Sequence, residues 1–401
     1  MIQTSNRLSL VKPSASMAAS MAAKALRSEG VDVIDLGMGE PDFPTPSHVV
    51  EATHTAMMNG ETLYTPSAGT LPLRRAIVEK FRRDNQLDYN IENILVANGA
   101  KQIIFNALLA TLNPGDEVIL PAPYFVSYPE MVKLLDGVPV VVPCPAETQF
   151  RLTPTALAAA ITPRTKWLFL NSPNNPSGIM YTAAEYRALA VVLSRHPHVM
   201  VLADEIYEHI LFDHRHFVSF GQACPELKDR LMIVNGVAKS YAMTGWRVGY
   251  AAASVPLITA LATVQSQSCT SVAAPMQAGA VAALTGSQAC VEVFRAAFER
   301  RRDLVVARVA KIKELTLHAP EGAFYAFIGC ADLIGRRTPA GDILVDDTAV
   351  SMYLLNEGHV ATVPGAAYGL SPFFRISTAA ADTVLEAAIE RIAQAVARLK
   401  A

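Results

Sequence analysis

The sequence predicts an α/β protein with a mostly parallel central sheet flanked by helices, followed by a smaller α+β domain. Short apolar segments alternate with segments of helical spacing through most of the chain. Such alternation is typical of the crossover units that build a parallel sheet. The apolar segments are nearly continuous, which indicates strands covered on both faces of the sheet.

Five apolar segments are the expected strands of the central sheet, and each ends in polar or turn-forming residues. They lie at residues 93–99, 116–123, 165–173, 199–205 and 230–236. Helical spacing of apolar side chains predicts helices at 100–112 and 183–196.

The last hundred residues have a different pattern. A long amphipathic segment at 292–315 predicts a helix. Three short strands and a final helix are expected after it, at 322–329, 359–365, 373–379 and 382–400. We therefore predict three parts: an N-terminal arm and segment that packs with the small domain (1–44), a large domain (45–290) and a small C-terminal domain (291–401).

Composition narrows the possible classes of function. The chain has 401 residues, with 34 lysines and arginines against 36 acids, which argues against a nucleic-acid or membrane surface as the main partner. Five cysteines without a CxxC pair suggest neither a disulfide framework nor a zinc site, so we expect a cytoplasmic protein. The N-terminus does not resemble a signal peptide. The histidine-containing stretches at 195–198 and 213–216 lack the spacing of a zinc pair, so no metal is expected.

Candidate anion-binding residues follow the first predicted strand, because ligands gather at the carboxyl ends of parallel strands. Gly99, Ala100 and Lys101 stand where that strand meets a helix, and the free amides of a first helical turn bind anions. Arg247 suits a phosphate through its planar fork of donors. Each has an ordinary alternative, since glycine is common before helices and Arg247 could form a surface ion pair.

Lys239, Asp204 and Asn175 are candidates for holding an aldehyde-bearing ring. A lysine in an apolar pocket has a lowered pKa, and its neutral amine attacks aldehydes; the alternative is a snorkelling surface lysine. Asp204 ends a buried strand and could pair with a protonated ring nitrogen, or instead form a salt bridge or a cap. Asn175 lies in the turn NSPNNPSG and could donate its amide to a ligand oxygen.

Together these residues match one cofactor, pyridoxal 5′-phosphate (PLP). PLP needs a phosphate grip, a stacking ring, a partner for its ring nitrogen, donors to its phenolic oxygen and an amine for its aldehyde. In that order, the candidates are Arg247 with the helix start, Tyr124, Asp204, Asn175 with Tyr207, and Lys239.

Eight motifs occur in order along the chain. They are GEPDFPTP, YTPSAGTLPLR, NGAKQ, PYFVSYPE, NSPNNPSG, DEIYEHI, NGVAKSYAMTGWRVGY and FRIS. In this order they resemble the fold-type I, class I/II aminotransferases, which are PLP-dependent transferases, and most of all the one-gamma subgroup of bacterial aspartate aminotransferases, some of which also accept prephenate. The resemblance implies ping-pong transamination through a Schiff base, and it makes residues 45–290 the PLP-binding domain.

The resemblance implies a role for each residue around the cofactor ring. Lys239 would bind the aldehyde and later move the substrate's proton. Asp204 would keep the ring nitrogen protonated. Tyr207 and Asn175 would bind the phenolic oxygen, and Tyr124 would stack on the ring.

The resemblance also implies how the phosphate is held. Arg247 and the backbone amides of Ala100 and Lys101 would bind it. Tyr64 would reach the phosphate of the neighbouring subunit, which implies a homodimer with shared active sites. Two positions depart from the pattern. Some relatives have a glycine where this chain has Ala100, a change that leaves the backbone donor in place, and many have Ser or Thr where this chain has Gly236. We therefore expect one phosphate donor to be absent or supplied elsewhere.

Substrate residues follow from the same resemblance. Arg375 would bind the α-carboxylate, with Asn175 and the Gly39 amide beside it. Lys101 and Ser16 match the positions that recognise a distal carboxylate, which favours aspartate and glutamate as amino donors. An aminotransferase for aromatic or neutral amino acids and a β-lyase stay open as alternatives. A PLP-binding transcription regulator is disfavoured, since no basic helix-turn-helix segment precedes the first motif.

Overall fold

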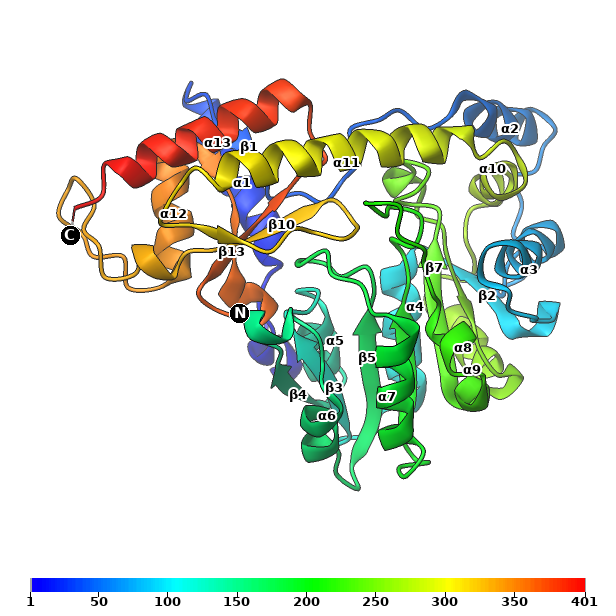
Figure 1. The fold of residues 1–401 in the computed structure, drawn as a ribbon. Helices are drawn as coiled ribbons and strands as arrows, with labels where there is room; N and C mark the ends of the chain where they lie inside the picture. Colours follow the sequence, from blue (N-terminus) through cyan, green and yellow to red (C-terminus); the bar gives the residue numbers. More distant parts are fainter. Residues whose placement is uncertain (1, 401) are drawn as a thin grey trace.

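A seven-stranded sheet forms the centre of the larger part of the chain, in a computed structural model that describes residues 2–400 (Figure 1). Its strand order is β2-β8-β7-β6-β5-β3-β4. Neighbouring strands are parallel except at β8, which runs antiparallel to both β2 and β7, so the predicted mostly parallel sheet is confirmed. The strands are β2 (Ile94–Ala97), β3 (Glu117–Ala122), β4 (Val138–Pro143), β5 (Thr165–Asn171), β6 (Met200–Asp204), β7 (Leu231–Gly236) and β8 (Gly249–Ala252).

Helices cover both faces of this sheet. They are α2 (Ser47–Met58), α3 (Leu71–Asn85), α4 (Ala100–Thr111), α5 (Tyr128–Leu134), α6 (Pro154–Ala160), α7 (Ala183–Leu193), α8 (Phe220–Ala223), α9 (Val255–Ser268) and α10 (Ala274–Thr285). Successive side chains of a strand point to opposite faces. In β6, Val201 packs in one buried cluster with Leu189 of α7, whereas Leu202 packs in another with Ile103 of α4. The strands are therefore apolar at nearly every position.

A four-stranded antiparallel sheet forms the centre of the smaller part, in the order β12-β13-β10-β9. Its elements are β9 (Thr316–Leu317), β10 (Tyr325–Gly329), β12 (Val363–Pro364), β13 (Phe373–Ser377), and the helices α11 (Ala289–Val309), α12 (Asp347–Gly358) and α13 (Asp382–Ala397). Figure 1 shows α11 running along the top of the molecule from the larger part to the smaller one.

The N-terminal segment joins the smaller part. After α1 (Ala15–Ser28), β1 (Ile34–Asp35) pairs in parallel with β11 (Val360–Ala361). The domain boundaries predicted at 44/45 and 290/291 stay a prediction, and the second of them falls inside α11. Within residues 2–400, no helix is long and apolar enough to span a membrane.

One helix is shorter than its amphipathic pattern predicted. The segment at 292–315 was expected to be helical throughout, but α11 ends at Val309. Ile312 and Leu315 donate their amides to carbonyls three residues earlier, and both side chains are buried in the cluster of the smaller part. Their burial requires the chain to turn inward at this point, which overrides the helical spacing.

Candidate active site

A pocket of about 340 Å³ lies between the carboxyl ends of the parallel strands and the N-terminal segment. The strand register aligns Asn171 at the end of β5 with Asp204 at the end of β6. Loops that follow β2, β6 and β7 add further wall residues, and β13 contributes one arginine. The predicted site residues on its wall are Ser16, Gly39, Gly99, Ala100, Lys101, Asn175, Asp204, Tyr207, Lys239, Arg247 and Arg375.

Lys239 lies on the pocket wall with its amine turned to the N-terminal segment. Its Nζ donates to the Gly39 carbonyl oxygen at 2.7 Å. Burial and, to a lesser extent, the positive charge of Arg375 lower the pKa of the Lys239 amine from the usual 10.5 to about 8, although the carboxylates of Glu40 and Asp204 oppose the change. The side chain is therefore no snorkelling surface lysine, and part of its population is a neutral nucleophile near neutral pH.

Asp204 is a buried carboxylate without a salt bridge in the described chain. The Tyr128 hydroxyl donates to its Oδ2 at 2.6 Å, and the Ile206 amide makes a longer bond of 3.4 Å to Oδ1. Burial raises the pKa of Asp204 from 3.8 to about 6, although these two hydrogen bonds and the charge of Lys239 pull it down. The carboxylate is thus charged at neutral pH and still has room for a cationic partner.

Tyr207 and Asn175 each contact another site residue. The Tyr207 hydroxyl shares a hydrogen bond of 2.8 Å with the hydroxyl of Tyr325, a residue of β10. The Asn175 Oδ1 accepts from Arg375 Nη1 at 3.1 Å. Two polar side chains from loops that follow strands of the large sheet are therefore hydrogen-bonded to two strand residues of the small sheet.

Arg375 is only 2% exposed, yet its guanidinium is incompletely paired. One nitrogen donates to Asn175 and another to the Gly37 carbonyl, while Nε has no hydrogen-bond partner among residues 2–400. The rings of Tyr325 and Tyr368 lie 4.6 and 5.3 Å from its central carbon. A buried cation with an unpaired donor fits an anionic ligand group such as a carboxylate.

The phosphate end of the predicted site is a glycine cradle. Gly99 adopts a φ of +88° just before α4, and a Cβ added there would strike the Arg247 guanidinium. The first-turn amides of Ala100 and Lys101 have no partner inside the helix. Burial lowers the pKa of the Lys101 amine, and the charge of Arg247 adds to this effect. The Arg247 guanidinium, the free amides and a cradle that a side chain would fill together fit a phosphate group.

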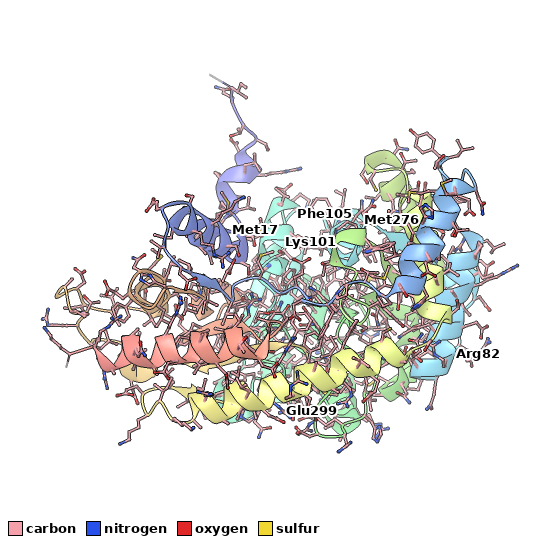
Figure 2. All side chains as sticks on the ribbon, turned by 90° about the horizontal axis from the view of Figure 1, so that it is seen from above. Met17, Arg82, Lys101, Phe105, Met276 and Glu299 are labelled. Carbon is pink, nitrogen blue, oxygen red and sulfur yellow. The ribbon has the colours of Figure 1, made fainter. Side chains whose placement is uncertain are left out.

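The distal end of the pocket is partly apolar. The Lys101 amine lies 5.2 Å from the centre of the Phe125 ring. Met17 and Ser16, at the start of α1, face the same pocket, and Figure 2 shows Met17 near Lys101 when the molecule is seen from above. A cation, a hydroxyl and apolar surface therefore meet where a substrate side chain would lie.

Tyr124, which was predicted to stack on the cofactor ring, does not line this pocket. Its side chain continues the alternating series Val118, Leu120 and Ala122 into the cluster beneath β3, and its ring packs against the Gly369 backbone. The next residue, Phe125, lines the pocket instead.

Two further positions, Tyr64 and Gly236, do not line this pocket. Tyr64 is 91% exposed and lies away from this pocket, beside a surface hollow. A Cβ at Gly236 would lie 3.0 Å from the Val248 carbonyl oxygen and 3.2 Å from Ile206 Cδ1, so a hydroxyl there would crowd β8. Thr244 lines the pocket, and its hydroxyl donates to the Glu40 carboxylate.

Tyr128, Tyr325 and Phe125 are the site residues that the sequence did not single out. Tyr325 lies in β10, Phe125 follows β3 and Tyr128 begins α5, and aromatic residues at such places are ordinary core components. The motif PYFVSYPE contains two of them. Its dense aromatic spacing was the signal available for their role.

Comparisons with known proteins agree with this geometry. The family described as aminotransferase class I and II matches residues 31–392. An aspartate aminotransferase of Rhizobium meliloti is 51% identical over 397 residues, which cover 99% of this chain and 97% of that protein. An aspartate/prephenate aminotransferase of Cereibacter sphaeroides is 51% identical over 388 residues, or 97% of each chain.

Solved structures give the same result. The crystal structure of the Rhizobium meliloti aspartate aminotransferase superposes with a TM-score of 0.97 at 51% identity and covers 100% of both chains. The Thermus thermophilus aspartate aminotransferase with maleate has a TM-score of 0.91 at 41% identity, covering 98% of this chain and 100% of its own.

Proposed function

The chain belongs to the aminotransferase class I and II family, and from this premise we propose that it transfers amino groups between aspartate or glutamate and 2-oxo acids. Membership makes it a PLP-dependent aminotransferase. The observation that supports a dicarboxylic substrate is the presence of two cationic side chains, Arg375 and Lys101, on the wall of one pocket. The related Thermus thermophilus enzyme was solved with maleate, a four-carbon dicarboxylate.

Each part of the cofactor is assigned to a different set of pocket residues. We assign the phosphate to Arg247 and the first-turn amides of α4, the ring nitrogen to Asp204, and the phenolic oxygen to Tyr207 and Asn175. Phe125 takes the ring-packing role first predicted for Tyr124, since it lines the pocket. Bound in this way, PLP supplies an aldehyde that captures amines and a protonated ring that withdraws electrons from the substrate Cα.

The protein's own groups then bind and move the proton. Arg375 holds the α-carboxylate, so that the Cα–H bond faces Lys239. With a pKa of about 8, about a tenth of the Lys239 amine is neutral at pH 7 and can accept that proton. Asp204, with a pKa of about 6, stays ionised beside a protonated ring nitrogen. These two pKa values are poised for the opposite roles that the two residues need.

Amino-donor profiling tests the proposed substrate. We expect aspartate and glutamate to be good donors, and Lys101→Met to raise the KM for aspartate by about tenfold or more, because a charged hydrogen bond to the distal carboxylate is lost. The KM for alanine serves as the control and should change little in the same variant. If phenylalanine or alanine outperforms aspartate in the wild type, the dicarboxylate proposal fails.

Acceptance of prephenate is a second candidate. Prephenate is a 2-oxo acid whose pyruvyl side chain is attached to a ring that carries a second carboxylate, and the pocket wall offers the apolar side chains of Met17, Met38 and Phe125 beside the Lys101 cation. The Cereibacter sphaeroides relative bears that activity in its name. A transamination assay with prephenate as the amino acceptor tests this activity. If an enzyme that is active with aspartate forms no product from prephenate, the second candidate function is rejected.

We also propose a homodimer whose partner supplies Tyr64. Exposed apolar side chains gather near Tyr64, with Leu63 83% and Met58 74% exposed, and exposed apolar patches mark interaction sites. A hybrid of Lys239→Ala and Tyr64→Ala chains tests the sharing. If Tyr64 serves the partner's site, one site in the hybrid has both residues intact and activity returns. If Tyr64 serves its own subunit, the hybrid stays inactive. A cytoplasmic location stays a prediction from the cysteine pattern.

A further inference from the structure

Residues 37–40 touch the two proposed substrate-handling cations through their backbone. The Gly37 carbonyl accepts from Arg375, and the Gly39 carbonyl accepts from Lys239 at 2.7 Å. The Glu40 carboxylate accepts from the hydroxyl of Thr244. Any movement of this short segment would therefore change the orientation of both cations.

The segment is held at its two ends by backbone and hydroxyl bonds. On the N-terminal side, Leu36 pairs with the Ala361 carbonyl at 3.1 Å and with the Ser377 amide at 2.8 Å. On the C-terminal side, Thr45 donates to the Ala242 carbonyl at 2.7 Å. Between these anchors, Met38, Gly39 and Glu40 line the pocket.

Between the anchors, Asp42 and Phe43 attach the segment to α11. Arg301 Nη1 and Nη2 donate to the two carboxylate oxygens of Asp42 at 2.8 and 2.9 Å. The Phe43 ring stacks on Phe294 with centroids 4.3 Å apart and meets Phe298 edge-on at 5.4 Å. Two parallel bonds from a planar guanidinium fix orientation as well as distance.

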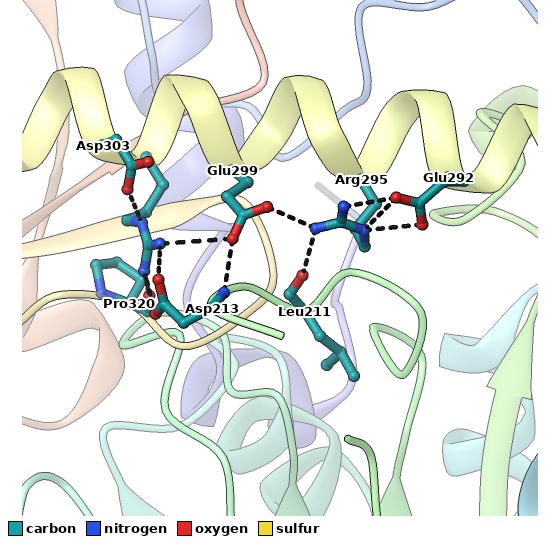
Figure 3. A network of polar contacts seen from close by, with 8 residues as sticks. Leu211, Asp213, Glu292, Arg295, Glu299, Asp303 and Pro320 are labelled. Atoms are coloured by element: carbon teal, nitrogen blue, oxygen red, sulfur yellow. Dashed lines mark hydrogen bonds and ion pairs between the residues drawn. The ribbon is translucent and has the colours of Figure 1, made fainter. Parts of the chain in front are cut away.

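Arg301 itself is buried and sits on a well-fixed helix. It is 6% exposed, and its side chain also lies over the Phe43 ring at 5.0 Å. Figure 3 shows the polar network that holds α11 on either side of this position. In it, Arg295 bonds to Glu299 and to the Leu211 carbonyl, and Glu299 accepts the Asp213 amide. The helix is thus a rigid base for Asp42.

We propose that Arg301 is a positioning residue for substrate binding, which acts through Asp42 to hold residues 37–40 against Lys239 and Arg375. The inference rests on the proposed function of this pocket. Without the fork of Arg301, the carbonyls of Gly37 and Gly39 lose their fixed placement. Part of the substrate's binding energy is then used to place Arg375 for its contact with the α-carboxylate. This raises KM more than it lowers kcat.

The neighbouring Arg300 provides a matched control. Arg300 lies on the same helix and pairs with Asp382 at 2.8 Å. Arg301 contacts the same carboxylate at 3.2 Å. Arg300 is 60% exposed at its side chain and has no ion pair with Asp42. A comparison of Arg301→Met with Arg300→Met therefore separates the contact with Asp42 from the contact with Asp382.

The experiment measures steady-state kinetics and hydrogen–deuterium exchange of the segment at 36–44 in both variants. We expect Arg301→Met to raise the KM for aspartate by about tenfold, to change kcat by less than about threefold, and to speed exchange in this segment. Arg300→Met should stay within about twofold of the wild type in each. Asp42→Asn should reproduce the KM effect and add little in the Arg301→Met background.

Two outcomes would overturn the proposal. One is an Arg301→Met enzyme with a lowered melting temperature but with KM and segment exchange equal to those of Arg300→Met, which would leave Arg301 a purely structural residue. The other is additive effects of Asp42→Asn and Arg301→Met. A wild type without transamination would instead overturn the proposed function, while the exchange data would still report whether Arg301 holds the segment.

Discussion

Replacing Tyr128 with phenylalanine removes the hydroxyl that stabilises the Asp204 carboxylate. The bond is 2.6 Å long and both side chains are buried. The ring itself would stay in place, because it packs edge-on against Phe125 and Phe169 at 5.5 and 5.2 Å. The substitution therefore isolates a single charged hydrogen bond.

The expected effect is a higher pKa for Asp204. A hydrogen bond to a charged group contributes about 1.5–3 kcal/mol, and one pKa unit corresponds to about 1.36 kcal/mol. The pKa of Asp204 should therefore rise from about 6 to roughly 7–8. At pH 7 the ionised fraction falls from about nine-tenths to between one half and one-tenth.

Unfolding of the cofactor-free protein reports this change. Between pH 3.8 and the folded pKa, folded Asp204 keeps a proton that the unfolded chain has released, so the free energy of unfolding falls as pH rises. In the wild type this fall ends near pH 6, whereas in Tyr128→Phe it should continue to roughly pH 7–8 and remove a further 1–3 kcal/mol or so. Urea unfolding at pH 5, 6, 7 and 8 measures both curves.

Tyr353→Phe is the control, since the Tyr353 hydroxyl donates to the neutral Ala395 carbonyl at 2.8 Å. Its loss of stability should not depend on pH across this window. If the Tyr128→Phe and wild-type curves run parallel from pH 5 to pH 8, the hydroxyl does not control the charge of Asp204 and the reasoning is refuted.

Three other substitutions test separate parts of the site. Lys239→Met in the cofactor-free protein should raise the free energy of unfolding at pH 7 by up to roughly 3 kcal/mol, because a pKa lowered from 10.5 to about 8 means that folding disfavours the ammonium form. The wild type regains this stability as pH rises from 8 to 10.5. If urea titrations show a difference in unfolding free energy between Lys239→Met and the wild type that stays constant with pH, burial does not lower the pKa of Lys239. Arg375→Lys should lower kcat/KM for aspartate by about a hundredfold, since an ammonium cannot form two parallel bonds to a carboxylate; a loss under about threefold in steady-state assays rejects that role. Gly236→Ser should cost about 1–3 kcal/mol in unfolding experiments through crowding of Val248, without tightening PLP binding in a fluorescence titration; tighter binding would show that the serine reaches the phosphate.

The sequence predicted the buried strands well because their signal is local. The five expected strands are apolar at nearly every position, and each was found within a few residues of its predicted limits. β8 was missed because Gly249, Ala251 and Ala252 carry little side chain and give no strand signal. β4 contains two prolines, which an edge strand tolerates but which argue against a strand in a sequence.

The pocket residues were predicted where chemistry constrains residue type, as at Lys239, Asp204 and Arg375. Residues whose role depends on the direction in which the side chain packs were not predicted. Tyr124 and Phe125 are adjacent aromatic residues, and which one faces the pocket depends on the pleat of β3 and on the contact with Gly369. Tyr325 reaches Tyr207 from a strand 118 residues away, so their bond exists only after both sheets have formed.

Borohydride reduction of the purified, PLP-loaded protein, followed by peptide mass mapping, tests most directly whether Lys239 is the residue that captures the cofactor. Reduction fixes an aldehyde to the amine that holds it, and the pocket contains a second lysine, Lys101, as an internal comparison. We predict the cofactor mass on the peptide that contains Lys239 and none on Lys101. A label on Lys101, or full transaminase activity in a Lys239→Ala protein, would contradict the assignment of this pocket.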